Sequence, residues 1–226
     1  MGFSNEFLLD LALRLPVVLF ALTIHEFMHG YVAWKCGDDT ALRAGRLTLN
    51  PLAHLDLLGT ICLIFAPIGW AKPVPVNPYN YHNPRRDEVL VSGAGVAANF
   101  AIAAAVAILV RVLLEQGIVP TTRLEGLVWI VMRYAIILNF GLFVFNLLPI
   151  FPLDGSHILR ELLPARAAAR FAELGRYGLF ILVGVVIVNR YIQFEFLGHP
   201  GVSPLMAPIL ALMYVFAGPT ATAILI

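Results

Sequence analysis

The sequence predicts an all-α, polytopic membrane protein that forms a single domain over residues 1–226. Of its 226 residues, 60% are hydrophobic and 13% are charged, whereas soluble domains are about 25% charged. Its mean hydropathy is +0.84. Charged residues are also missing from several stretches of about 20 residues, the length that a bilayer-crossing helix needs. These observations exclude a soluble enzyme and a disordered chain. The net charge of +1 provides no basic surface, so no nucleic-acid partner is expected.

Charged residues mark the ends of five predicted full transmembrane helices. Between Arg14 and Lys35 the only charged residue is Glu26, and none lies between Glu88 and Arg111. Three later stretches are bounded in the same way. We expect the surface of each helix to contact the lipid bilayer directly. The five spans lie near residues 8–33, 89–112, 127–149, 174–192 and 204–225.

The segment 57–71 allows two interpretations. It is apolar but short, and Pro67 and Gly69 interrupt it. It therefore forms either a re-entrant hairpin or a sixth span. The neighbouring sequence is rich in proline and unsuited to regular helix, so short β-strands are expected around residues 45–80. This irregular region is also a candidate for binding substrate as an added strand.

The distribution of cationic residues favours the re-entrant interpretation. If 57–71 does not cross, ten Lys and Arg residues in the loops 35–88 and 150–176 lie on one side of the membrane, against two in the opposite loops. The positive-inside rule then places both long loops and the C-terminus in the cytosol. If 57–71 crosses, this asymmetry disappears. We therefore expect a multi-pass protein of the cell membrane.

The first span contains a zinc-hydrolase motif, His25-Glu26-Phe27-Met28-His29. Positions i and i+4 share one face of a helix, so both imidazoles can bind one Zn²⁺ ion. Glu26 is then placed to take a proton from a coordinated water, as in other HExxH hydrolases. The alternative is that the three side chains face a watery cleft and hydrogen-bond one another. Ionisable residues inside a span favour a functional site.

A third metal ligand is expected at Asp154. A catalytic zinc site needs three protein ligands and an open position. The metzincin extension fails, because Lys35 occupies the position of its third histidine. Asp154 follows 20 uncharged residues, so it lies at the membrane edge. With a re-entrant 57–71, Asp154 and His29 reach the same cytosolic side. The alternative is that Asp154 only caps a helix beginning near Ser156.

These motifs resemble the site-2 protease family of intramembrane zinc metalloproteases, in its compact prokaryotic type without PDZ or CBS domains. The resemblance includes HExxH, Leu-Asp-Gly at 153–155, and a glycine-rich stretch that ends at Asn99. The family usually has Gly-Pro-x-x-Asn there, and this chain has Val96 in place of the proline. The resemblance implies that His25, His29 and Asp154 bind one zinc ion and that Glu26 activates water.

The resemblance also implies a substrate class. Family members cleave membrane proteins within or near their spans, often after another protease has trimmed them. Asn99 would contact the unwound substrate backbone or the oxyanion; alternatively, it joins two helices by hydrogen bonds. The competing function classes are a membrane metal transporter and a pseudoprotease that only binds membrane helices. The oligomeric state is not predicted.

Overall fold

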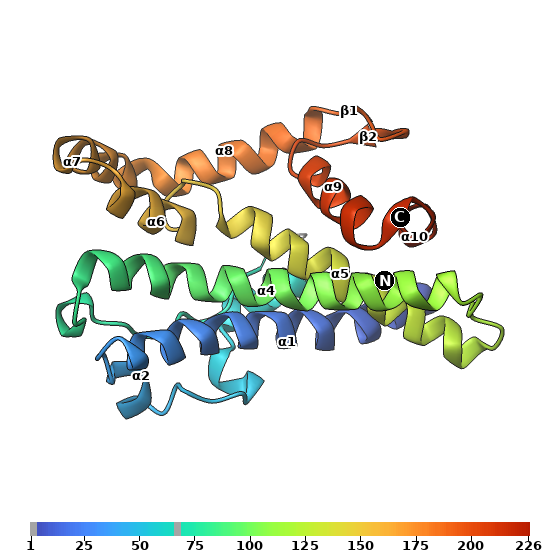
Figure 1. Ribbon diagram of the computed structural model, residues 1–226, viewed down its shortest axis with the longest axis horizontal. Coiled ribbons are helices and arrows are strands. Elements are labelled where there is room, and N and C mark those ends of the chain that lie inside the picture. Colours follow the sequence, from blue (N-terminus) through green and yellow to red (C-terminus); the bar gives the residue numbers. More distant parts are fainter. Residues whose placement is uncertain (1–3, 66–68) are drawn as a thin grey trace.

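The computed structural model describes residues 4–65 and 69–226. Three long helices form the centre of the molecule: α1 (Asn5–Lys35), α4 (Pro84–Glu115) and α5 (Arg123–Asn146). Each of them contacts the other two, and α1 and α4 run side by side for most of their length (Figure 1). The side chains of Ser4, Asn83 and Thr122 accept hydrogen bonds from the first-turn amides of these helices, which explains where each begins.

Within the described residues, four helical stretches are long and apolar enough to cross a membrane. Three are α1, α4 and α5, and the fourth is the stretch Ala165–Tyr191. These correspond to four of the five predicted spans. The last stretch comprises α7 (Ala165–Glu173), the short 3-10 helix η3 (Leu174–Tyr177) and α8 (Gly178–Tyr191).

The prediction of a fifth continuous helix over 204–225 is not confirmed. This region forms two shorter helices, α9 (Met206–Phe216) and α10 (Gly218–Leu225). Gly218 has a φ of 84°, a left-handed conformation that ends a helix, and Pro219 lies in the first turn of the next one. The apolar composition is continuous, but the backbone turns at this glycine.

The two ends of the segment 57–71 meet. Its only described helix is α3 (Leu57–Phe65); residues 66–68, which include Pro67, lie outside the described residues. Leu55 and Ala71 form an antiparallel β-bridge, and the amide of Lys72 donates to the carbonyl of His54 at 2.8 Å. The segment thus begins and ends at the same place, which supports the re-entrant interpretation.

The predicted strands around 45–80 are not found among the described residues of that region, apart from the isolated Leu55–Ala71 bridge. Prolines at 73, 75 and 78 lack the amide that a strand ladder uses. This region instead holds α2 (Thr40–Arg43) and two 3-10 helices, η1 (Pro51–His54) and η2 (Pro78–Asn80). The described strands, β1 (Phe194–Phe196) and β2 (His199–Val202), form an antiparallel hairpin between α8 and α9.

The main apolar core lies where α4, α5, α9 and α10 meet. Small residues of α4 let the neighbouring helices approach closely, and larger residues of α5 and α9 fill the remaining space. After α5, an irregular segment leads into α6 (Asp154–Leu162), which packs against α4. The core residues include Ala103, Ala107, Val110, Ile136, Phe140, Leu210 and Met213.

Candidate metal centre

Three predicted ligands meet at one point between α1 and α6. The Nε2 atoms of His25 and His29 are 3.0 Å apart, and they lie 3.2 and 3.4 Å from Oδ2 of Asp154. With metal–ligand bonds of about 2.0–2.1 Å, the ligand atoms of a tetrahedral zinc site lie about 3.3–3.4 Å apart. The three atoms therefore already have the spacing of one face of such a site.

The histidine side chains are oriented by hydrogen bonds to α4. His25 Nδ1 lies 2.7 Å from Oδ1 of Asn99. The Asn99 amide nitrogen donates to the carbonyl of Ala21 at 3.2 Å and to Oδ1 of Asn139 at 2.8 Å, which fixes the amide orientation. His25 Nδ1 must then carry the hydrogen. His29 Nδ1 likewise donates to the carbonyl of Val91 at 2.7 Å.

This tautomer leaves a lone pair on each Nε2, directed at the other histidine and at Asp154. The close approach of the two Nε2 atoms is then not a hydrogen bond, because neither carries a hydrogen. Oδ2 of Asp154 is buried and has no hydrogen-bond partner among the described residues. Three acceptors thus converge without a donor, which costs free energy unless a cation lies between them. Two imidazoles and one carboxylate are a ligand set that fits zinc.

Asp154 is the first residue of α6 and not its cap. The N-cap position is Leu153, and no side chain caps this helix. A Cβ added to Gly155 would lie 2.2 Å from the carbonyl oxygen of Leu147, so only glycine lets α6 begin this close to the end of α5. The capping alternative for Asp154 is therefore wrong.

Glu26 is held by a different segment from the three candidate ligands. Its Oε2 accepts a hydrogen bond of 2.8 Å from the amide of Val74, in the extended segment between the α3 region and η2. The position next to His25 rotates Glu26 about 100° around the helix from the histidine face. Glu26 therefore lies to one side of the histidine face, with one carboxylate oxygen bonded to backbone.

Asn99 is fully buried, and its hydrogen bonds with His25, Ala21 and Asn139 join α4 to α1 and α5. Its position beside His25 was not anticipated from the sequence, and neither was Asn139, to which its amide nitrogen donates. The sequence feature that could have indicated Asn139 is a polar side chain within the uncharged stretch before Asp154. The predicted contact of Asn99 with substrate stays a prediction.

Gly95 is a functional position that sequence reasoning missed. A Cβ at this position would lie 2.6 Å from Nε2 of His29 and 2.8 Å from Nδ1 of His25. Only glycine allows α4 to pass this close to both rings. The sequence signal was the single glycine of the Gly-x-x-x-Asn pattern that ends at Asn99.

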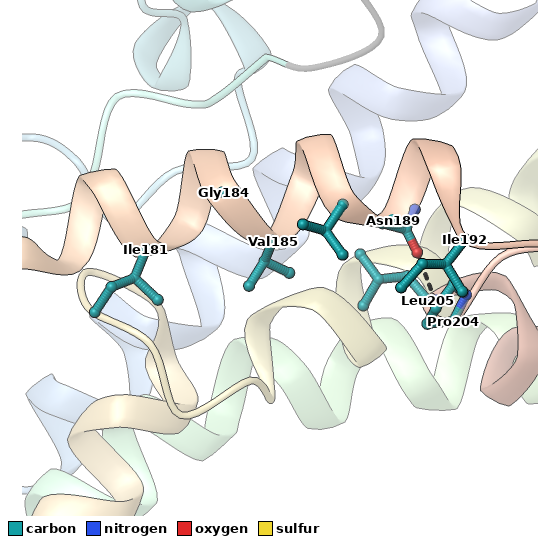
Figure 2. Close-up of a pocket in the computed structure, with 8 residues that line it drawn as sticks. Ile181, Gly184, Val185, Asn189, Ile192, Pro204 and Leu205 are labelled. Carbon is teal, nitrogen blue, oxygen red and sulfur yellow. Dashed lines mark hydrogen bonds between the residues drawn. The ribbon is translucent and has the colours of Figure 1, made fainter.

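A separate apolar groove of about 480 Å³ lies between α8 and the start of α9 (Figure 2). At its end, Oδ1 of Asn189 accepts a hydrogen bond of 2.8 Å from the amide of Leu205. None of the candidate ligands lines this groove. Its lining residues are Ile181, Gly184, Val185, Val188, Asn189, Ile192, Pro204 and Leu205.

The chain is similar to proteins that are named as zinc metalloproteases. The model of peptidase family M50 matches residues 14–188, a range that includes all three candidate ligands and Glu26. YwhC of Bacillus subtilis strain 168, named as a zinc metalloprotease, is 40% identical over 189 residues, which cover 80% of this chain and 83% of YwhC. Rip2 of Mycolicibacterium smegmatis, also so named, is 31% identical over 195 residues, which cover 82% of this chain and 73% of Rip2. No solved structure matches the chain.

Proposed function

The chain belongs to peptidase family M50 and is a zinc-dependent metalloprotease, and we propose that it hydrolyses peptide bonds within or near the transmembrane segments of membrane proteins. The observation that carries this proposal is the convergence of His25 Nε2, His29 Nε2 and Asp154 Oδ2 among helices long enough to cross a membrane. In this proposal, these three atoms hold a single zinc ion. When bound, zinc supplies a Lewis acid that polarises the scissile carbonyl and acidifies water.

Glu26 is the proposed general base. The amide of Val74 holds Oε2, which restricts rotation of the carboxylate. The other oxygen, Oε1, takes the proton from the attacking water and delivers it to the departing amine nitrogen. The hydrogen bonds on His25 Nδ1 and His29 Nδ1 keep both rings aimed at the centre while the proton moves.

The proposed substrate is a membrane protein with a transmembrane segment, trimmed beforehand by another protease. A helical segment must unwind locally before cleavage, because its amides are bonded within the helix. The side-chain amide of Asn99 can hydrogen-bond to the substrate backbone only if it gives up a present bond, to the Ala21 carbonyl or to Asn139.

We place the protein in the cell membrane, with the metal centre toward the cytosolic side. The charge asymmetry of the loops supports this orientation. The Leu55–Ala71 bridge supports the re-entrant 57–71 segment on which this charge count depends, because it returns the chain to the side from which α3 begins.

The test is cleavage of a tagged model membrane substrate by purified protein in lipid vesicles. Glu26→Gln should lower kcat by about 10²–10⁴-fold, the usual contribution of a general base, while zinc content stays the same. Glu6→Gln, on an exposed position of the same helix, is the matched control and should cleave normally. His25→Ala and Asp154→Ala should bind zinc more weakly and retain less of it on purification, as measured by elemental analysis.

Full cleavage by Glu26→Gln would contradict the proposal. Zinc transport into vesicles that survives Glu26→Gln, without cleavage by the unaltered protein, would instead support a transporter. Binding of membrane helices without cleavage would support a pseudoprotease.

A further inference from the structure

Glu88 is a buried carboxylate on α4 that the proposed mechanism does not use. Its side chain is 9% exposed, and burying a charge is costly unless it is paired. Its Oε1 accepts a hydrogen bond of 3.0 Å from Nδ1 of His157 and lies 3.6 Å from Nη2 of Arg160. Both partners belong to α6, the helix that begins with Asp154. Glu88 therefore joins the N-terminal part of α4 to the candidate metal-binding helix.

The partners of Glu88 share a face of α6 with Asp154. Asp154, His157 and Arg160 are spaced three residues apart, and positions i and i+3 are neighbours on a helix surface. A second anchor lies at the other end of α6, where Arg85 donates to the carbonyls of Glu161 at 2.5 Å and of Leu163 at 3.2 Å. Two points on α4 thus fix both the position and the direction of α6.

The three candidate ligands differ in how they are held. His25 and His29 each donate a hydrogen bond from Nδ1, to Oδ1 of Asn99 and to the carbonyl of Val91 on α4. Oδ2 of Asp154 is buried without a hydrogen-bond partner in the described part of the chain. The placement of its carboxylate therefore depends on how α6 is docked.

We propose that Glu88 is a positioning residue for the metal centre: through His157 and Arg160 it fixes α6 on α4, and so sets the distance from Asp154 Oδ2 to the two histidine Nε2 atoms. This inference rests on Asp154 being the third zinc ligand. Glu88 and Val91 lie one turn apart on α4. Val91 orients the ligand His29 of α1, and Glu88 positions α6, which carries the ligand Asp154. Glu88 itself contacts no reacting atom in this proposal.

The test measures the zinc dissociation constant by chelator competition in detergent-solubilised protein, together with the melting temperature of the zinc-free form. Glu88→Ala should weaken zinc binding about 10–100-fold, as loss of a group that orients a metal ligand usually does. Glu88→Gln keeps an acceptor for His157 and should weaken binding less. Glu115→Gln, which removes an exposed charge paired with Arg111 at the far end of α4, should leave zinc affinity unchanged.

A double-mutant cycle separates positioning from general stability. If Glu88 acts through Asp154, then Glu88→Ala should weaken zinc binding in the unaltered protein and have no further effect in an Asp154→Ala background. An equal loss in both backgrounds, or a lower melting temperature with unchanged zinc affinity, would overturn the inference.

Two further results keep the proposal testable. If Glu88→Ala does not fold, then His157→Ala, at a less buried position, should still weaken zinc binding, and unchanged affinity would overturn the inference. If Asp154→Ala itself leaves zinc affinity unchanged, the ligand set under the proposed function fails, and the positioning role fails with it. Failure of Glu88 alone leaves the ligand set standing.

Discussion

Single atoms decide whether the histidine pair can receive a metal, and Gly95 shows this most directly. A methyl group there would lie 2.6 Å from Nε2 of His29, the nitrogen expected to bind zinc. Gly95→Ala should therefore displace a ring and weaken zinc binding by at least about tenfold. Chelator competition measures the change.

Gly93→Ala is the matched control for that substitution. Gly93 lies on the same helix half a turn away, with nothing within 4 Å of the position that its Cβ would occupy. Zinc affinity should stay within twofold of the unaltered protein. Equal losses of zinc affinity from both substitutions would mean that α4 tolerates no added side chain in this region. The explanation that Gly95 specifically makes room for the two histidine rings would then be wrong.

Asn99 has two candidate roles that zinc affinity and KM can separate. Its Oδ1 holds the His25 ring, so Asn99→Ala should weaken zinc binding about 10–100-fold. Asn146→Ala, which removes only a bond to the carbonyl one turn earlier in α5, should not. Unchanged zinc affinity with a raised KM would instead support the predicted contact with substrate.

At this scale, the sequence predicted residues whose role follows from local spacing. His25 and His29 are four apart on one helix, and the structure brings them together with the distant Asp154. The contributions of Gly95 and the Val91 carbonyl could not be predicted, because they depend on the register between α1 and α4. The role of the Val91 carbonyl also cannot be inferred from the residue type, because every residue has a backbone carbonyl.

Among the elements, the junction after α1 is fastened by one carboxylate. Asp38 is fully buried and accepts hydrogen bonds from Thr40, from the amide of Asn77 at 2.6 Å and from the side chain of Asn80 at 2.8 Å. Burial raises the pKa of Asp38, but these hydrogen bonds outweigh it, so its pKa lies below the usual value. The contact holds the segment that carries Val74 against the end of α1.

Asp38 should therefore contribute to acid sensitivity. Its folded pKa lies below its unfolded pKa of about 3.9, so its stabilisation is complete above that value and is lost as the pH falls through the folded pKa. Asp38→Asn should lower the free energy of unfolding at pH 7 by about 1–3 kcal/mol. The melting temperature of the variant should fall less between pH 6 and pH 3.

Asp39→Asn is the control, because Asp39 is partly exposed and ion-paired with the exposed Arg43. It should change the melting temperature at pH 7 little. If both substitutions give the same acid profile, Asp38 is not the group responsible.

The long helices were predictable because each combines a long run with few or no charged residues and a polar cap at its start. The break in the last predicted span was not, since the apolar pattern is the same on both sides of Gly218. The strands were misplaced for a different reason. The sequence of the 45–80 region suggested extended backbone, but its prolines lack the N–H groups that strand pairing needs. The hairpin at 194–202 depends on left-handed backbone conformations at Leu197 and Gly198.

Over the whole molecule, a return of the chain at the 57–71 segment makes a topological prediction. Tyr79, 96% exposed, and Arg166 should lie on one face of the membrane, and Thr121 on the other. Single cysteines at these positions, in a background with Cys36→Ala and Cys62→Ala, can be labelled in intact cells with a membrane-impermeant maleimide. Thr121→Cys should react from outside, and the other two only after lysis.

Labelling of Tyr79→Cys and Arg166→Cys from opposite faces would mean that 57–71 crosses the membrane.

Composition alone predicted a membrane protein, because a chain that is 13% charged has too few polar side chains to cover itself in water. The separation of α8 from the central helices could not be predicted, since an apolar sequence does not say whether lipid or protein covers it.

The extended segment beside Glu26 has an uneven supply of hydrogen-bonding groups. Pro73 and Pro75 have no N–H, and the amides of Lys72 and Val74 already donate within the protein. Over these four residues the backbone has only carbonyl oxygens to offer a neighbouring chain. A polypeptide aligned there would have to supply every N–H itself, so a proline in that polypeptide would form one hydrogen bond fewer with this stretch than any other residue.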